Sequence, residues 1–233
     1  MTRAYMNWSG GKDSALCLYR ARQEKDTDTG CLLTSVNSVY HRISMHGVRR
    51  ELLVAQAESI GLPLRTMELP EWPGMAEYEA ILDTTVAQLK AEGYTQTLFG
   101  DIFLEDLRRY RENQLARTGI TCRFPLWGED TRALMEEFIG LGFKALVVCV
   151  NGNVLDASFC GRELDASFLE DLPAAVDPCG ERGEYHTFVY DGPLFRHPVA
   201  FERGDLTERT YPAPQDTDAP VPVFYFQDLL PAE

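Results

Sequence analysis

The hexapeptide Ser-Gly-Gly-Lys-Asp-Ser near the N-terminus combines residue types that bind phosphate. It follows a short apolar run, 4–8, and precedes a stretch with helical spacing of apolar residues that begins at Ala15. Two glycines permit a tight turn that brings backbone N–H groups close to an anion. A helix N-terminus adds unpaired donors and the positive end of its dipole. The segment therefore predicts a strand, a glycine turn and a helix start that bind phosphate oxygens through Ser9, Gly10, Gly11, Lys12, Asp13 and Ser14.

The spacing separates this loop from the common nucleoside triphosphate loop. That loop requires G-x-x-x-x-G-K-[ST], and its first glycine is missing here. S-G-G-x-D-S resembles instead the signature of the ATP pyrophosphatase loop, which grips the β- and γ-phosphates of ATP and releases them together as diphosphate. We therefore expect ATP as ligand and AMP as product. An ordinary turn between a strand and a helix is the alternative.

A second group of chemically active residues lies late in the chain. Asp177, Glu181, Glu184 and His186 fall within ten residues, among several glycines. Carboxylates and an imidazole at this density can bind magnesium, shape a substrate pocket or transfer protons. A solvated acidic loop with capping carboxylates is the alternative, and composition alone favours it.

Alternating strand and helix patterns must position these residues. Strands are expected at 31–36, 64–68 and 97–99, and helices between them at 49–60 and 77–92, each helix closed by a glycine. This order predicts an α/β fold with a Rossmann-like, mostly parallel sheet and helices on both faces. Ligands of such sheets bind beyond the carboxyl ends of the strands. One rim should therefore bring together the loop at 9–14 with Asn7, Asn37, Gly100 and Asp101.

The second half of the chain changes character after a charged helix expected at 105–118. A helix at 131–141 and a strand at 144–150 lead into a loop-rich region, and a hairpin is expected at 199–211, with Arg203-Gly204-Asp205 as its turn. A Pro-rich link at 212–222 precedes a last apolar strand. We expect an ATP-binding pyrophosphatase-type domain at 1–120 and a smaller mixed α/β domain on the acceptor side at 121–233.

Composition excludes several classes of protein. No apolar run approaches the roughly 20 residues that span a bilayer, so no membrane insertion is expected. Residues 1–50 hold eight Lys or Arg against four Asp or Glu, and the net charge of −14 leaves −18 on the remainder, which argues against extensive nucleic-acid binding. Six scattered cysteines without C-x-x-C predict buried thiols, no disulfide, no tightly bound transition metal and a cytoplasmic location.

Five segments together resemble the diphthine–ammonia ligase family of the ATP pyrophosphatase, adenine-nucleotide α-hydrolase-like superfamily. The resemblance runs from about residue 4 to 196, and the loop alone would indicate only the superfamily. The segments follow the family order: Ser9 to Ser14, Gly100-Asp101-Ile102, Pro125-Leu126-Trp127, Leu155-Asp156 with Gly161-Arg162-Glu163-Leu164-Asp165, and Cys179-Gly180-Glu181-x-Gly183-Glu184.

The resemblance implies an ATP-dependent amidation. A carboxylate is activated as an acyl adenylate, diphosphate leaves, and ammonia displaces AMP; in that family the acceptor is diphthine, a modified histidine of elongation factor 2. Magnesium would neutralise triphosphate oxygens. The implied catalytic residues are Lys12, Asp13, Glu181, Glu184 and His186. The implied acceptor-side residues are Asp156, Arg162, Cys179, Gly180 and Glu181.

The chain also departs from the family pattern. Where eukaryotic and archaeal ligases read G-E-[FY]-E-T-F, it has His186 in place of a carboxylate, and 38–50, with His41 and His46, does not match the expected pattern. This version resembles the bacterial branch, and bacteria are not expected to make diphthamide. The alternatives are ligation on another carboxylate, a tRNA-modifying enzyme of the same superfamily, and a non-catalytic nucleotide-binding sensor. A homo-oligomer is left open. The segment 177–188 is expected to face the glycine loop.

Overall fold

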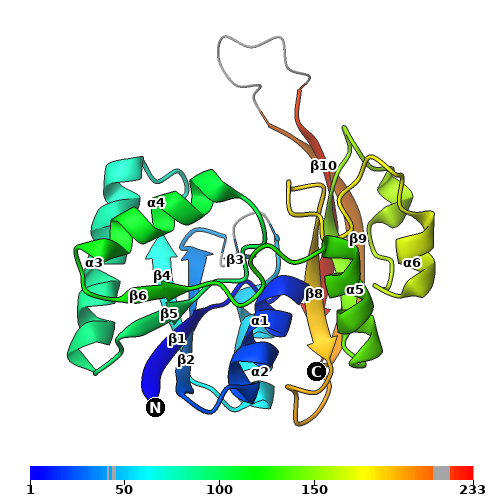
Figure 1. The fold of residues 1–233 in the computed structure, drawn as a ribbon. Helices are drawn as coiled ribbons and strands as arrows, with labels where there is room; N and C mark the ends of the chain where they lie inside the picture. The colour runs from blue at the N-terminus through cyan, green and yellow to red at the C-terminus, as the bar shows by residue number, and fades with distance from the viewer. Residues whose placement is uncertain (41, 44–45, 212–220, 233) are drawn as a thin grey trace.

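The computed structural model describes residues 1–40, 42–43, 46–211 and 221–232 (Figure 1). Residue 41, with the histidine at that position, and most of the Pro-rich link at 212–222 lie outside the described residues. Two sheets stand side by side, each with its own helices. This arrangement confirms the predicted α/β class, with a mostly parallel sheet flanked by helices and a smaller second sheet.

Sheet A contains the N-terminal strands and is mostly parallel. Its central strand β1 pairs with β2 on one side and β5 on the other, and β4 and β6 extend the parallel pairing. A short β3 pairs antiparallel with the end of β2. The strands are β1 (Thr2–Asn7), β2 (Thr27–Asn37), β3 (Arg42–Ile43), β4 (Leu64–Leu69), β5 (Gln96–Leu98) and β6 (Thr121–Arg123).

Alternation along β1 explains why helices cover both faces of sheet A. Ala4 and Met6 belong to one buried cluster with residues of α1 (Lys12–Gln23) and α2 (Arg50–Ile60). Tyr5 points to the opposite face. There it joins a cluster with residues of α3 (Met75–Ala91) and α4 (Glu105–Ala116).

Sheet B is antiparallel, in the order β8-β7-β10-β9. Its strands are β7 (Lys144–Asn151), β8 (Tyr185–Asp191), β9 (Phe201–Thr210) and β10 (Val223–Pro231). The helix α5 (Thr131–Gly140), the short turn η1 (Ala157–Phe159) and α6 (Ala166–Asp171) accompany it. The N-cap carboxylates of α5 and α6 each accept a backbone N–H, which fixes where these helices begin.

The prediction of a hairpin at 199–211 is wrong. Phe201–Thr210 is one continuous strand, β9, which pairs along its length with β10. The register shifts where Gly204 and Asp205 lie opposite the single residue Asp228, so the glycine marks a bulge rather than a turn. A Cβ at Gly204 would lie 3.2 Å from the Cβ of Asp228.

The two sheets share one buried apolar cluster. It contains Met6 and Trp8 at the end of β1 together with Val147 of β7 and Phe188 of β8. Gln56 of α2 is fully buried at this junction. It accepts a hydrogen bond from the Trp8 indole N–H (2.9 Å) and donates to the carbonyls of Gly10 (3.0 Å) and Val189. One amide thus joins α2, the glycine loop and sheet B.

Among the described residues, no helix is both long enough and apolar enough to cross a membrane. All six cysteines are free thiols; five are buried and Cys122 is half-buried.

Substituting Gln56→Ala should lower the free energy of unfolding by about 2–4 kcal/mol, because an indole N–H and two buried carbonyls lose their partner. Chemical denaturation measures the change. Gln88→Ala, on the exposed side of α3, is the matched control and should change the free energy by no more than about 0.5 kcal/mol. A loss for Gln56→Ala as small as that of the control would contradict this account.

Candidate functional site

The glycine loop, residues 9–14, turns from β1 into α1 at the edge that faces sheet B (Figure 1). Gly10 has a positive φ of 78°, which favours glycine, and its carbonyl accepts the N–H of Val189. Gly11 has no room for a side chain, because a Cβ would lie 3.1 Å from both the His46 ring and the Thr187 carbonyl. The loop is therefore shaped by contacts with β8 as well as by its own sequence.

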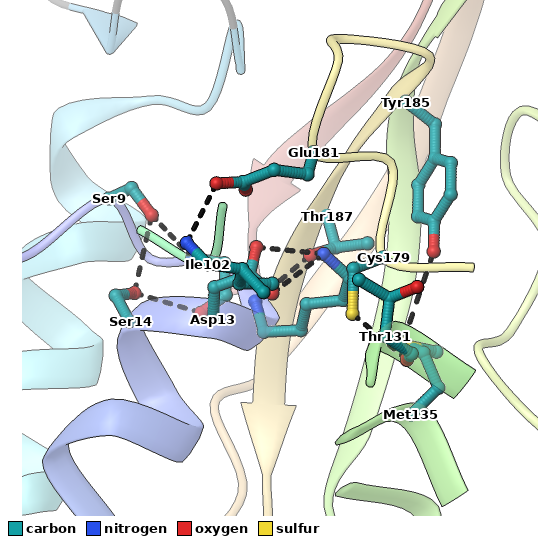
Figure 2. Close-up of polar contacts among 12 residues, drawn as sticks. Ser9, Asp13, Ser14, Ile102, Thr131, Met135, Cys179, Glu181, Tyr185 and Thr187 are labelled. Carbon is teal, nitrogen blue, oxygen red and sulfur yellow. Dashed lines mark hydrogen bonds and ion pairs between the residues drawn. The ribbon is translucent and has the colours of Figure 1, made fainter. Parts of the chain in front are cut away.

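Hydroxyl groups order the inside of this loop. Ser14 Oγ donates to the Gly11 carbonyl at 2.8 Å, Ser9 Oγ lies 3.2 Å from Ser14 Oγ, and the Gly11 N–H donates to Ser9 Oγ. The Lys12 N–H, the first of α1, donates to Thr187 Oγ1 of β8 at 3.0 Å. Figure 2 shows these groups converging around the start of α1.

The buried Lys12 and the partly exposed Asp13 form an ion pair, with the ammonium 2.7 Å from the carboxylate. The ammonium also lies over the Tyr185 ring, 5.3 Å from its centroid. Burial is the largest single influence and penalises the charge of Lys12. The charge and hydrogen bond of the Asp13 carboxylate, together with Tyr185 and Cys179, outweigh it and raise the pKa of Lys12 above its usual value. A fixed cation therefore stays beside the glycine loop at physiological pH.

A cavity of about 500 Å³ opens beside the loop, which is a size suited to a nucleotide-sized ligand. Its polar part combines the glycine loop with side chains from several later segments. That part is lined by Asn7, Ser9, Asp13, Ser14, Thr34, Ser35, His46, Gly100, Asp101, Arg111, Glu181 and His186.

The segment after β5 approaches the loop closely. A Cβ on Gly100 would lie 3.0 Å from the backbone carbonyl of Asp13, so only glycine allows this spacing. The neighbouring Asp101 carboxylate pairs with Arg111 of α4 at 2.6 Å. Arg111 in turn lies over the Phe99 ring, 4.4 Å from its centroid. Gly100 and Asp101 thus line the cavity as expected, and the Arg111 guanidinium lies beside them.

Glu181, in the segment 177–188, is a carboxylate that lines the cavity. Its Oε1 accepts the Ile102 N–H at 2.8 Å (Figure 2). Burial raises the pKa of Glu181 to about 7; the Ile102 N–H opposes this shift and the Asp13 charge adds to it. A carboxyl group that titrates near neutrality can accept or donate a proton at working pH.

Glu184 occupies a different place. It is buried, and its two carboxylate oxygens accept the N–H groups of Asp177 (3.1 Å) and Arg182 (2.9 Å). It borders a separate cavity of about 350 Å³ rather than the one beside the glycine loop. Asp177 similarly accepts the N–H groups of Cys179 and Glu181. The Asp177 and Glu184 carboxylates thus hold, through backbone N–H groups, the turn that contains Glu181.

Two histidines face each other at the cavity. His186 of β8 and His46, between β3 and α2, have ring centroids 4.6 Å apart and ring planes inclined by 33°. His46 Nδ1 lies 3.2 Å from the Thr187 carbonyl. Burial lowers the pKa of His46 to about 4. Burial also lowers the pKa of His186 well below its usual value, and the nearby His46 and Lys12 add to this shift.

Other expected residues lie elsewhere. The side chain of Asn37 caps a turn by accepting the N–H groups of residues 39 and 40. Asp156 begins η1, and Arg162 pairs with Asp171 at 2.8 Å. Cys179 is buried with its thiol 3.2 Å from the Thr131 carbonyl, and burial raises its pKa. None of these side chains borders the cavity beside the loop. Gly180, with φ 66°, packs against the Tyr185 ring.

Three residues shape the site without being marked as site residues by the sequence: His46, Arg111 and Thr187. His46 stands out in the sequence only as a departure from the family pattern, and Arg111 belongs to a helix rich in charged residues, where nothing marks one arginine. Thr187 stands in an apolar strand pattern beside His186. Their roles depend on distant segments meeting, which local spacing does not encode.

Comparison with known proteins identifies both halves of the chain. Residues 2–121 match the model of the diphthamide synthase N-terminal domain, and residues 130–209 match that of the diphthamide synthase C-terminal domain. These matches confirm the family predicted from the motifs.

Individual relatives agree with the family models. The Danio rerio protein named diphthine–ammonia ligase is 32% identical over 191 residues, covering 74% of this chain and 72% of that protein. Those of Bos taurus and Homo sapiens are 32% and 30% identical over 132 residues, covering 54% of this chain and about half (48%) of each relative. The chain belongs to the diphthamide synthase family, whose members include the diphthine–ammonia ligases.

Proposed function

We propose that this chain is an ATP-dependent, AMP-forming ligase that adenylates the carboxylate of diphthine and amidates it with ammonia. Its relatives bear the name of that reaction. The observation that carries the proposal is the placement of Glu181 across the same cavity as the glycine loop. A site for the diphosphate of ATP and a titrating carboxylate then meet at one point, as a two-step acyl transfer requires.

The loop residues fit the phosphates of ATP. Hydroxyls of Ser9 and Ser14, the N-terminus of α1 and the buried Lys12 ammonium are donors or positive charge, and Gly10 and Gly11 leave space for close approach. In the proposed adenylation they stabilise the charge on the departing diphosphate. The substrate carboxylate, otherwise a poor electrophile, gains AMP as a leaving group.

Magnesium would enter with ATP. Among the described residues, no group of three or more His, Cys, Asp or Glu side chains is arranged to hold a metal ion. Magnesium in nucleotide sites commonly uses one or two carboxylates together with substrate phosphates and water. Asp13 and Asp101, which border the cavity, are the carboxylates that suit this role in the proposal.

The later residues take different parts in the proposal. Glu181 is proposed as the proton acceptor for the nitrogen nucleophile, because its pKa lies near neutrality. Glu184 stays a prediction as a catalytic residue; its two backbone partners support the different proposal that it shapes the loop that presents Glu181. Asp156, Arg162 and Cys179 likewise stay predictions as acceptor-side residues.

The division of labour follows the two sheets. We propose that residues 1–120 bind ATP and that residues 121–233 form most of the acceptor side, although β6 (Thr121–Arg123) still pairs in sheet A. Free, largely buried thiols support a reducing, cytoplasmic location. A homo-oligomer stays a prediction, which analytical ultracentrifugation would test.

One residue supports a different acceptor. His186 stands where eukaryotic and archaeal ligases have a carboxylate, so the same ATP chemistry on a different carboxylic acid is the second candidate. Parallel assays with diphthine-bearing elongation factor 2 and with a panel of carboxylic metabolites separate the two. The true acceptor alone loses about one mass unit, because NH2 replaces the OH of its carboxyl group.

Substituting Asp13→Asn or Ser14→Ala should lower turnover by at least about tenfold, or about 1.4 kcal/mol of transition-state stabilisation. The loss follows from weakening the groups that order the phosphate loop. Nucleotide chromatography after incubation with ATP, ammonia and acceptor measures it. Asp83→Ala, on α3, removes a surface ion pair with Arg117, which follows α4; it is the control and should retain activity. Production of ADP instead of AMP by the unmodified protein would refute the proposal.

The rate of amide formation should rise with pH through about 7, because Glu181 accepts a proton only once it has lost its own. The concentration of free NH3 is kept constant across the series, so that ammonium ionisation does not contribute. Glu181→Gln should be at least about tenfold slower and lack this rise. Glu136→Gln, exposed on α5, should follow the unmodified profile. An identical pH profile in Glu181→Gln would remove Glu181 from the reaction.

A further inference from the structure

The histidine pair at the cavity has a geometry that the proposed adenylation does not use. His186 Nε2 is buried and has no hydrogen-bond partner among the described residues. The rings of His46 and His186 lie 4.6 Å apart, and both border the cavity that also contains Glu181 and the glycine loop. A buried, unpaired ring nitrogen costs free energy unless a ligand pairs with it.

Hydrogen bonding determines which nitrogen of His46 is free. A carbonyl oxygen can only accept, so the contact between His46 Nδ1 and the Thr187 carbonyl requires a proton on Nδ1. In the neutral ring, Nε2 then has the lone pair and acts as an acceptor. His186 Nε2 is buried without a protein partner, and it is a second acceptor when the ring carries its proton on Nδ1. Two acceptors on adjacent rings suit a ligand with several N–H groups.

The charges around the pair keep both rings neutral. Burial lowers both pKa values, and the nearby Lys12 ammonium lowers them further. The anionic groups of the same cavity are Asp13, which is paired with Lys12, Asp101, which is paired with Arg111, and Glu181. Among the described residues, Glu181 is therefore the carboxylate of this cavity that has no basic side-chain partner and can take a proton there.

Sheet B fixes the segment that presents His46. Asp228 of β10 pairs with Arg42 at 2.8 Å and with Arg49 at 2.7 Å, on either side of the histidine. A Cβ at Gly47 would lie 3.1 Å from the Phe226 ring of the same strand. The His46 ring in turn lies against Gly11. Residues on both sides of His46 thus contact β10, and His46 itself lies between the glycine loop and His186 of β8.

We propose that His46 and His186 form the binding site for ammonia, the nucleophile of the second half-reaction. This inference rests on the proposed function. Ammonia has three N–H donors and one lone pair, so it can donate to two imidazole nitrogens and to Glu181 while the lone pair stays free to attack. The neighbouring glycine loop would hold the phosphate side of the acyl adenylate within reach.

Ammonia reacts as NH3. The nitrogen lone pair forms a C–N bond with the acyl carbon, and the bond from that carbon to the AMP oxygen breaks, with the electron pair leaving on AMP. The nitrogen then carries a positive charge and gives one proton to the Glu181 carboxylate, which yields the neutral amide. No oxidant or reductant takes part.

The test separates ammonia binding from adenylation. His46→Phe and His186→Phe keep a ring but remove the acceptors, and His46→Gln and His186→Gln restore a hydrogen-bond acceptor. With diphthine-bearing elongation factor 2, ATP and ammonium chloride, each Phe variant should raise KM for ammonia at least tenfold. Exchange of labelled diphosphate into ATP, measured without ammonia, should stay within twofold. The Gln variants should recover KM to within threefold of the unmodified value.

His197→Phe is the matched control, because His197 lies in an exposed loop and contacts the Pro198 carbonyl; it should change neither quantity. Thermal unfolding shows whether each variant is folded, and His46→Leu or His186→Leu, which also lacks a ring acceptor, replaces a Phe variant that is not. An unchanged KM in a folded Phe or Leu variant, or a parallel loss of diphosphate exchange and amide formation, would overturn the ammonia assignment. Absence of exchange in the unmodified protein would instead overturn the proposed function, and the assignment with it.

Discussion

The docking of the glycine loop against β8 is the interaction on which the rest of the site depends. The Gly10 carbonyl accepts the Val189 N–H, and Thr187 Oγ1 accepts the first N–H of α1. Gln56 bonds to both sides of this junction. A phosphate loop usually needs only its own strand and helix, but here one edge is supplied by the second sheet. Residues of the first half of the chain line most of the cavity, and Glu181 and His186 of the second half complete it.

Electrostatics at this junction divides the ionisable groups into distinct roles. Lys12 is buried and pairs with the partly exposed Asp13, so the carboxylate offsets part of the cost of burying the ammonium beside the loop. Glu181 pairs with a backbone N–H instead of a cation, and burial moves its pKa to about 7. The two histidines stay neutral beside Lys12. One cavity thus combines a fixed charge, a titrating acid and neutral acceptors.

Local patterns predicted the strand-loop-helix unit at 9–14 and the parallel order of sheet A, because glycine turns and apolar periodicity are encoded in adjacent residues. They failed at 199–211, where Gly204 forms a bulge opposite Asp228 and only the partner strand reveals it. The motif at 177–188 marked the important loop but did not separate Glu181, in the cavity, from Glu184, bound to backbone N–H groups. The placement of His46 depends on Asp228, 182 positions away, which pairs with Arg42 and Arg49. Residues near His46 in the sequence therefore do not predict its role.

Transfer of oxygen from the acceptor to AMP tests the central claim most directly. Diphthine-bearing elongation factor 2 with an ¹⁸O-labelled diphthine carboxylate is incubated with ATP and ammonia, and the nucleotide product is analysed by mass spectrometry. An acyl adenylate leaves one carboxylate oxygen on the phosphate of AMP when ammonia displaces it. The account predicts one ¹⁸O in AMP for each amide formed. Label in inorganic phosphate with ADP as the nucleotide product, or amide formation with unlabelled AMP, would contradict it.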